Sequence, residues 1–388
     1  MSPNGFGLAL PLGLVLTLWA AACSTEAAPE PAQDAANTAT TATATSVKTV
    51  AAPATQCSLD VRTTSPTAPL GPWTSRGPLP CPGPEGIDIL AVGDVGFPGP
   101  RLDSSVAAMK SLCATQGCDL LAIPGDLIYG SGDHAEEVWR SVWDNSLAGL
   151  GLPGLTVLGN HEYRHEDNPA GKRTAVYAAD GRAGLVLPGP TYVARLRRGE
   201  STLLAVAAID TDSVAHPAPE MPGGAAETLA AACAEGAPVL VIGHHPPTSQ
   251  GRHHSHEAHV ETALRALLRA VPEGCQIGAV LAGHDHDLQA YGPGCEEAGT
   301  PAVIVSGVAA RGFRPPGPQH LPRCPSAPTA AKYHAGPSDD GGFAWVRLPP
   351  ALPYVPSADT SPPPVSGKAT LYQVPPTGPA FVLSSIDW

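Results

Sequence analysis

The sequence predicts an α/β fold with largely buried sheets, and three features of the chain lead to this prediction. Apolar runs of four to six residues recur along the chain and have the length and composition of buried strands. Helical stretches separate several of these runs, which favours alternating strands and helices. A polar side chain that could bind a metal follows each run, next to a glycine in most cases. Because ligands bind beyond the carboxyl ends of strands in open α/β sheets, these side chains are expected to share one rim.

The folded domain is expected to span residues 87–388, after an irregular, Pro-rich lead-in over residues 57–86. The strands that precede the polar side chains are residues 87–92, 120–123, 155–158, 205–209, 239–242 and 279–282. The helical stretches are residues 104–113, 136–147 and 257–268. Residues 342–348 and 369–374 are expected to form two further strands. Because residues 349–367 are rich in Pro and Ser, the loop that joins these two strands is expected to be long and irregular.

The N-terminal region has the composition of an export signal followed by a tether. Residues 7–22 are apolar or small and end at Cys23, the pattern of a bacterial lipoprotein signal (residues 1–22) whose cysteine carries lipid after cleavage. An ordinary signal peptide cut near Ala22 is the alternative. Residues 23–56 form a low-complexity tether rich in Ala, Thr and Pro, because so few large apolar side chains cannot offset the entropy cost of folding. The sequence therefore predicts an exported protein that is anchored to a bacterial membrane, in the periplasm or at the cell surface, or else secreted.

The net charge of the 388-residue chain indicates which partners are excluded, and its cysteines indicate the redox compartment. A formal net charge of −13 repels a phosphate backbone, so no nucleic-acid partner is expected. No obligate protein partner is evident. The nine cysteines fit an oxidising compartment, and setting Cys23 aside leaves an even number for disulfides. Cys113 with Cys118 and Cys295 with Cys324 are candidate pairs, but the spacing leaves the connectivity open.

Five short motifs occur in an order that chance assembly does not explain. They are Gly93-Asp94-x-Gly96, Gly125-Asp126-x-x-Tyr129, Gly159-Asn160-His161-Glu162, Gly243-His244-x-Pro246 and Gly283-His284-Asp285-His286. This ordered set resembles the calcineurin-like metallophosphoesterase superfamily and, within it, the purple, tartrate-resistant acid phosphatases. Many relatives have a metal-binding His where this chain has Gly96, and Tyr129 resembles the replacement ligand of the purple phosphatases. The chain has neither a phosphate loop ending in Gly-Lys-Ser/Thr nor a Gly-x-Ser-x-Gly elbow.

The resemblance implies a four-layer α/β-β/α sandwich, with two mixed sheets flanked by helices, and a site for two metal ions. The first metal, Fe(III), would be bound by Asp94, Asp126, Tyr129 and His286. A phenolate is a hard anionic oxygen donor and suits Fe(III). The second metal, Fe(II), Zn or Mn, would be bound by Asp126, Asn160, His244 and His284. Asp126 would bridge the two ions, because a short carboxylate offers two oxygens.

The resemblance also implies the reaction, which is hydrolysis of phosphate monoesters. A hydroxide held between the ions would attack phosphorus in line with the leaving group, because the metals lower the pKa of bound water. His161 would protonate the leaving alkoxide. A His in the loop after Gly243-His244-x-Pro246 would contact the phosphate. Spacing favours His253 for that role, although His254 is as reachable.

Two other functions remain open from the sequence. A phosphodiesterase or nucleotidase could use the same metal site, because the ligands do not distinguish these reactions. A non-catalytic lipoprotein could use the metals to capture phosphate or a partner. His161 favours an enzyme over such a binding protein, because capture alone requires no proton donor.

Overall fold

The computed structural model describes residues 56–64, 70–130, 132–163, 169–216, 224–295, 297–313, 331–334, 336–350 and 365–388. The predicted signal segment, Cys23, nearly all of the predicted tether and Cys324 lie outside these residues. None of the helices in the described ranges combines the length and the apolar composition needed to cross a bilayer.

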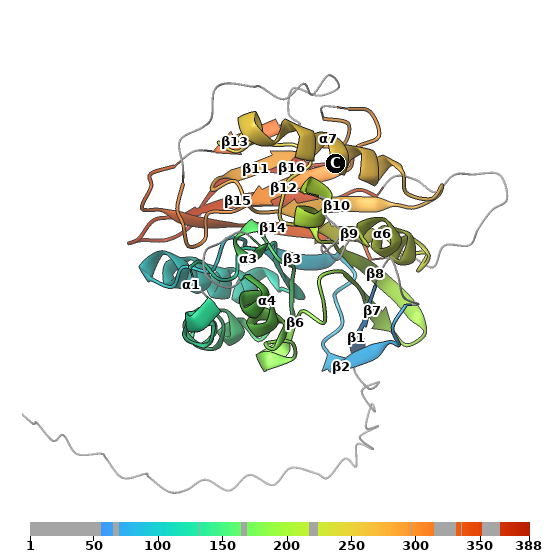
Figure 1. Cartoon of the computed structure of the whole chain (residues 1–388), viewed down its shortest axis with the longest axis horizontal. Coiled ribbons are helices and arrows are strands. Elements are labelled where there is room, and N and C mark those ends of the chain that lie inside the picture. Colours follow the sequence, from blue (N-terminus) through green and yellow to red (C-terminus); the bar gives the residue numbers. More distant parts are fainter. Residues whose placement is uncertain are drawn as a thin grey trace, which may run out of the picture. The chain divides into compact units, whose positions relative to one another are not determined.

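Two mixed β-sheets form the centre of the fold, and helices cover their outer faces (Figure 1). The nine-stranded sheet has the order β13-β11-β12-β10-β9-β8-β7-β1-β2, and the seven-stranded sheet has the order β16-β15-β14-β3-β4-β5-β6. Helices α6 and α7 lie over the larger sheet, whereas α1 and α4 lie over the smaller one (Figure 1). Apolar residues of both sheets pack into one large core cluster. The predicted sandwich of two mixed sheets flanked by helices is therefore confirmed.

The elements have the following bounds. The larger sheet contains β1 (Cys57–Thr63), β2 (Thr74–Leu79), β7 (Tyr192–Arg198), β8 (Ser201–Ala208), β9 (Val239–Ile242), β10 (Ile277–Ala282), β11 (Leu288–Tyr291), β12 (Ala302–Ser306) and β13 (Ala331–His334). The smaller sheet contains β3 (Ile87–Ala91), β4 (Leu120–Ile123), β5 (Gly154–Thr156), β6 (Leu185–Val186), β14 (Gly341–Leu348), β15 (Lys368–Val374) and β16 (Phe381–Asp387). The α-helices are α1 (Pro100–Gln116), α2 (Ala135–Val138), α3 (Asn160–Tyr163), α4 (Pro169–Tyr177), α5 (Thr211–Ala215), α6 (Ala225–Cys233) and α7 (His254–Arg269). Short turns of other helix types are η1 (Gly132–His134), η2 (Trp139–Asp144), η3 (Leu147–Leu150) and η4 (Arg182–Gly184).

Parallel pairing dominates the centre of each sheet. Strands β3, β4, β5 and β6 are parallel neighbours, and so are β8, β9, β10 and β12. Every residue of β3, β4 and β9 is buried, as expected for parallel strands covered on both faces. The carboxyl ends of neighbouring parallel strands lie at the same edge of a sheet, so the polar residues after them are brought together.

The prediction that residues 57–86 are irregular is wrong. Cys57, Leu59 and Val61 are buried along β1 and alternate with more polar residues, which is the period of a strand. The whole of β1 pairs with β7, from Cys57 opposite Arg198 to Thr63 opposite Tyr192. The prolines obscured this pattern, yet none of them lies within β1. The larger sheet therefore begins well before the predicted domain boundary.

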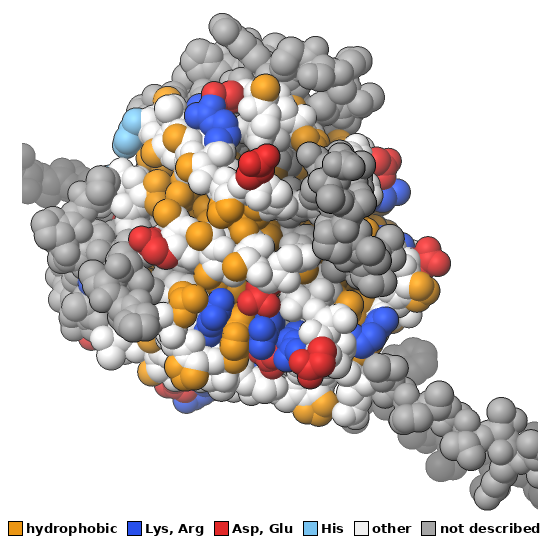
Figure 2. Space-filling model, turned by 90° about the vertical axis from the view of Figure 1, so that its right-hand side faces the viewer, with side chains coloured by type: hydrophobic (Ala, Val, Ile, Leu, Met, Phe, Trp, Pro, Cys, Tyr) orange, Lys and Arg blue, Asp and Glu red, His pale blue; other side chains and the backbone are white. Residues whose placement is uncertain are grey.

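Figure 2 looks at the right-hand side of Figure 1, where Lys and Arg side chains lie beside Asp and Glu. Ion pairs of this kind join β1 to β7, since Asp60 lies 3.3 Å from the guanidinium of Arg195 and 3.4 Å from that of Arg197. Arg195 also pairs with Glu235, which follows α6, at 3.2 Å. Arg195 and Arg197 therefore hold β1 against β7 near one end of the larger sheet.

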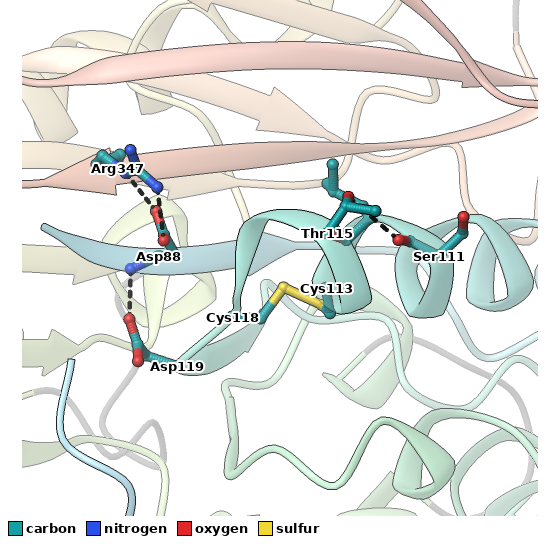
Figure 3. Close-up of a disulfide and its surroundings, with 8 residues drawn as sticks. Asp88, Ser111, Cys113, Thr115, Cys118, Asp119 and Arg347 are labelled. Atoms are coloured by element: carbon teal, nitrogen blue, oxygen red, sulfur yellow. Dashed lines mark hydrogen bonds and ion pairs between the residues drawn. A yellow bond between two sulfur atoms is a disulfide. The ribbon is translucent and has the colours of Figure 1, made fainter. Parts of the chain in front are cut away.

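Disulfides hold the ends of several elements. Cys57 is bonded to Cys81, Cys113 to Cys118 and Cys233 to Cys275. The candidate pair of Cys113 with Cys118 is thus confirmed, and it ties the end of α1 to the chain entering β4 (Figure 3). Cys295 is also disulfide-bonded, while its predicted partner lies outside the described residues.

Strand β3 is fixed on both sides near this disulfide (Figure 3). Arg347 of β14 donates to both carboxylate oxygens of Asp88 at 2.7 and 2.8 Å. The backbone N–H of Asp88 donates to the carboxylate of Asp119 at 2.7 Å. These bonds set the register of β3 between its neighbours, and β3 and β4 both lead into the site described next.

Candidate metal centre

The site lies where the carboxyl ends of strands from both sheets meet. The turns after β3, β4 and β5 of the smaller sheet and after β9 and β10 of the larger sheet supply its side chains. Backbone bonds join the two sheets here, because Gly93 N donates to Ser306 O at 2.7 Å and His284 N donates to the Asp94 carboxylate at 2.9 Å. The structure places all the predicted ligands around this junction: Asp94, Asp126, Tyr129, Asn160, His244, His284 and His286.

Three of these residues have a left-handed backbone. The φ angles are 57° at Asp94, 52° at Asp126 and 69° at His284. A non-glycine residue pays on the order of 1–3 kcal/mol for such a conformation, so the surrounding structure must hold it. Asp94 N donates to Gly125 O at 3.1 Å, which braces one sharp turn against the next. Concentrated backbone strain of this kind is typical of functional sites.

The backbone is tightly packed at Gly96, the position at which the resemblance would place a metal-binding histidine in many relatives. Gly96 N donates to Asp126 O at 3.0 Å, so the two turns pack directly on each other. A Cβ atom at Gly96 would lie 2.6 Å from the backbone carbonyl of Leu127. A side chain at that position would collide with the backbone of the turn after β4.

A first group of donor atoms surrounds Asp94. The hydroxyl of Tyr129 donates to Asp94 Oδ1 at 3.1 Å, and His286 Nε2 lies 3.2 Å from the same oxygen. Atoms about 2.0–2.1 Å from a shared ion, in tetrahedral or octahedral geometry, lie roughly 2.9–3.4 Å from one another. The distances from Asp94 Oδ1 to Tyr129 and to His286 both fit the spacing of ligands on one metal ion.

A second group consists of acceptor atoms that face one another. His244 Nε2, Asn160 Oδ1 and His284 Nδ1 are separated by 2.9, 3.0 and 3.2 Å. The other nitrogen of His244 must carry its hydrogen, because it bonds to the carbonyl of Pro124 at 2.9 Å. The other nitrogen of His284 bonds to the carboxylate of Glu257 at 2.7 Å and donates in the same way. With the hydrogens in these positions, the lone pairs of all three atoms face one another, which suits a cation. Burial opposes protonation of His284, but the hydrogen bond and charge of Glu257 outweigh it and raise the pKa of His284 to about 8, so a bound metal ion would displace a proton there.

Asp126 lies between the two groups. Its Oδ1 is 3.4 Å from His244 Nε2 in the second group, and burial together with its charge raises the pKa of Tyr129 in the first. It accepts the backbone N–H of His161 at 3.0 Å and is 2% exposed. This is the position that a bridging carboxylate requires.

The electrostatics of the site also favour cations. Burial, followed by the charge of Asp126, raises the pKa of Asp94 to about 7. Burial alone would raise the pKa of Asp126 too, but the charges of His244 and His161 outweigh it and lower that pKa to about 2. Burial and the two carboxylates hold the pKa of Tyr129 well above its usual range. A divalent cation bound here would lower the pKa values of Asp94 and Tyr129, since coordination favours their ionised forms.

Glu162 is a site residue whose role the sequence did not indicate. Its carboxylate accepts the backbone N–H groups of Leu127 and Ile128 at 3.0 and 2.9 Å, and that of Gly159 at 2.7 Å. It is fully buried. One side chain therefore links the turn that carries Asp126 and Tyr129 to the turn that carries Asn160. The one feature of the sequence that could have indicated this role is the position of Glu162 within the third motif.

The predicted catalytic histidines lie on opposite sides of the donor atoms. The ring of His161 is 4.4 Å from that of Tyr129, and its Nε2 is 3.9 Å from Asp126. The ring of His253 is 4.3 Å from that of His284, and Asp285 accepts its backbone N–H at 3.0 Å. The side chain of His254 lies outside the described residues, so the choice between His253 and His254 stays open.

Two further residues near the rim are structural in this fold. Asp210 caps α5 by accepting the backbone N–H groups of Asp212 and Ser213. His245 is buried, and its Nδ1 hydrogen-bonds the hydroxyl of Thr211 at 3.0 Å. Asp210 therefore fixes the start of α5, and Thr211 joins that start to the turn that carries His244 and His245.

Glu257 should control binding of the second ion. Removing it in Glu257→Ala frees the ring of His284 to turn and to change tautomer, so the second metal should bind about 10–100-fold more weakly while the first is retained. Titration of metal-free protein, followed by calorimetry and metal analysis, measures both affinities. Glu257→Gln keeps an acceptor oxygen and should lose much less. Equal affinities in Glu257→Ala and wild type would contradict the role.

Known proteins support the fold and the family. The model of the calcineurin-like phosphoesterase family matches residues 87–288. No curated protein matches the chain. Among solved structures, GAP50, the anchor in the inner membrane complex of Plasmodium, is similar with 14% identity and a TM-score of 0.53, over 77% of this chain and 87% of that one.

Two other solved structures are similar at lower scores. A dimetal phosphatase from Danio rerio has 13% identity and a TM-score of 0.46, over 78% of this chain and 99% of that one. PhoD has 13% identity and a TM-score of 0.45, over 82% and 76% of the two chains. At such identities these likenesses concern the fold alone. The family match covers more than half of the 388 residues and every predicted metal ligand, and this chain therefore belongs to the calcineurin-like phosphoesterase family.

Proposed function

We propose that this protein hydrolyses phosphate monoesters at two metal ions, with a site like that of the purple acid phosphatases. Membership of the family makes it a metal-dependent phosphoesterase. The observation that carries the proposal is the convergence of His244 Nε2, Asn160 Oδ1 and His284 Nδ1 at 2.9–3.2 Å, beside the Tyr129–Asp94–His286 group. Two adjoining ion sites that share Asp126 can hold a phosphate group between them.

The side chains around the proposed ions have different roles in the reaction. Two metal ions held by these ligands would supply activated water and neutralise the charge of the phosphate. His161 is 25% exposed and faces Tyr129 and Asp126, so it can deliver a proton to a leaving oxygen on the open side of the site. Lys172 donates to the carbonyl of His161 at 2.5 Å and fixes that turn. His253 lies on the side of the second ion, where it can contact the phosphate.

Hydrolysis of p-nitrophenyl phosphate by the purified protein tests the proposed function. Turnover should require metal, stop with a chelator and return when iron, zinc or manganese is added. Bis-p-nitrophenyl phosphate should be cleaved more slowly than the monoester. Faster cleavage of the diester would instead identify a phosphodiesterase, and metal binding without cleavage of either would identify a binding protein.

We also propose that the first ion is Fe(III), bound by the phenolate of Tyr129. Charge transfer from the phenolate to iron should give the loaded protein a purple colour, and Tyr129→Phe should lose the visible absorption band. A visible spectrum with metal analysis of the same sample measures this. Full activity in a colourless, iron-free protein would overturn the iron assignment and leave the phosphoesterase intact.

The protein is further proposed to be exported and anchored through a lipid on Cys23. The disulfides of the folded part support an oxidising compartment. Expression in bacteria should place the wild type in the detergent phase of a Triton X-114 extract and Cys23→Ser in the aqueous phase. Equal partitioning of the two proteins would favour the ordinary signal peptide.

A further inference from the structure

Arg311 lies beside the first ion site, in the turn after β12. Its guanidinium carbon is 4.6 Å from the centre of the Tyr129 ring and 5.2 Å from the centre of the Phe97 ring. The two rings are themselves 6.0 Å apart in an edge-on arrangement. The cation is thus held against two aromatic side chains, one of which reaches Asp94 through its hydroxyl.

The backbone around Arg311 is anchored from another element. Arg101 of α1 donates to the carbonyl of Ala310 at 2.6 Å, and Gly312 N donates to Val308 O at 3.3 Å. Phe313, two residues further on, is buried. The turn therefore presents Arg311 from a defined position, so little ordering is needed when a ligand binds it.

The guanidinium of Arg311 has no carboxylate partner among the described residues. Arg347, Arg195 and Arg182 each pair with an acidic side chain, as expected in a chain of net charge −13. Arg311 makes only its two ring contacts within the described ranges and is partly exposed. Its donors are left for an external anion, and a planar guanidinium suits carboxylates and phosphates.

Phe97 lies on the solvent side of the contact between Arg311 and the two rings. It is 50% exposed, and few large apolar side chains in the described part of the chain are as accessible. The guanidinium lies over the face of Tyr129, whereas the hydroxyl of that ring points to the metal ligands. An anion bound at Arg311 would therefore lie next to the proposed metal site, beside the ring that contributes one of its ligands.

We propose that Arg311, with Phe97 and Tyr129, forms a second anion site that binds a negative group on the leaving part of the substrate. This inference rests on the proposed function. The substrate class it selects is phosphate esters or anhydrides whose leaving group carries a further phosphate or carboxylate. A substrate with a neutral leaving group gains nothing from this site.

AMP and ADP form a matched pair of probes. Water splits AMP into phosphate and a neutral nucleoside, but it splits ADP into phosphate and AMP, which keeps its phosphate. Arg311→Met in the metal-loaded protein should lower kcat/KM for ADP about tenfold or more, mainly through KM, since one charge-assisted contact is lost. The kcat/KM for AMP and the inhibition constant of inorganic phosphate should change less than about threefold.

Control variants separate this site from general effects. Arg311→Lys should retain part of the preference for ADP, and Arg140→Met, at an exposed arginine on η2, should behave as the wild type. Equal losses on AMP and ADP would overturn the proposal, because Arg311 would then act on the metal-bound phosphate or on Tyr129. Unchanged kinetics on both would overturn it as well. A wild type inactive on p-nitrophenyl phosphate, AMP and ADP would instead overturn the proposed function.

Discussion

Asp126→Asn is expected to lower kcat/KM for p-nitrophenyl phosphate by more than about a hundredfold, which exceeds the usual cost of losing a residue behind a metal ligand. Asp126 is buried between the two donor groups, 3.4 Å from His244, and burial together with its charge raises the pKa of Tyr129. Asparagine keeps one acceptor oxygen for the N–H of His161 but loses the negative charge that two neighbouring cations require. Steady-state kinetics at saturating metal, together with metal analysis, measure the loss.

The same variant should behave differently without metal. Burial and the charge of Asp126 raise the pKa of Asp94, so losing that charge relieves Asp94. It also removes the attraction to His244 and His161 that lowers the pKa of Asp126. Because the two effects oppose each other, the melting temperature of the metal-free protein should change little. Added metal should then raise the melting temperature of the wild type more than that of Asp126→Asn, because a ligand at a given concentration stabilises the folded state more when it binds more tightly. The same change at the exposed Asp133 is the control. Normal activity with two bound ions in Asp126→Asn would show that it does not bridge.

Glu162→Ala is expected to cost at least about 3 kcal/mol of unfolding free energy, because three buried N–H groups lose their acceptor. These groups belong to Leu127, Ile128 and Gly159. The turns that carry Asp126 and Asn160 also lose their link, so both metals should bind about 10–100-fold more weakly. Urea unfolding of the metal-free protein and metal titration measure the two effects separately.

Glu162→Gln provides a graded comparison. Its single amide oxygen can serve Leu127 and Ile128, but its NH₂ group would face the N–H of Gly159, so a smaller loss is expected. Glu137→Ala removes an exposed carboxylate, 79% accessible, and should change neither quantity. A Glu162→Ala protein within about 0.5 kcal/mol of the wild type, the range of ordinary surface changes, would show that solvent replaces the lost acceptor.

Local pattern predicts the parallel centre of both sheets well. The runs at 120–123 and 239–242 coincide with β4 and β9, because a strand buried on both faces needs a continuous apolar run. Strands near the edge of a sheet are less visible: β1, which lies between β7 and the edge strand β2, alternates between buried and polar positions. The prolines of this region lie outside β1. The run at 136–147 forms α2 and then the π-helical turn η2, a change that side-chain periodicity does not reveal.

The sequence made the residues of the site predictable, because a glycine and a polar side chain follow each buried strand. Such residues are expected at the rim formed by the carboxyl ends of the strands. The left-handed backbone at Asp94, Asp126 and His284 comes from the packing of one turn on another. The same holds for the tautomers that Pro124 and Glu257 impose, and for the three donors that meet Glu162.

The position of Arg311 likewise depends on the tertiary structure and not on any sequence motif. It stands 182 residues after Tyr129 in the chain, and no motif marks it. Its place over that ring arises because β12 and β4 belong to different sheets whose carboxyl ends meet. Sequence alone determined which atoms could bind metals and phosphate, since those properties belong to each side chain. Their distances and the groups that face them depend on how the two sheets pack, and only the tertiary structure decided them.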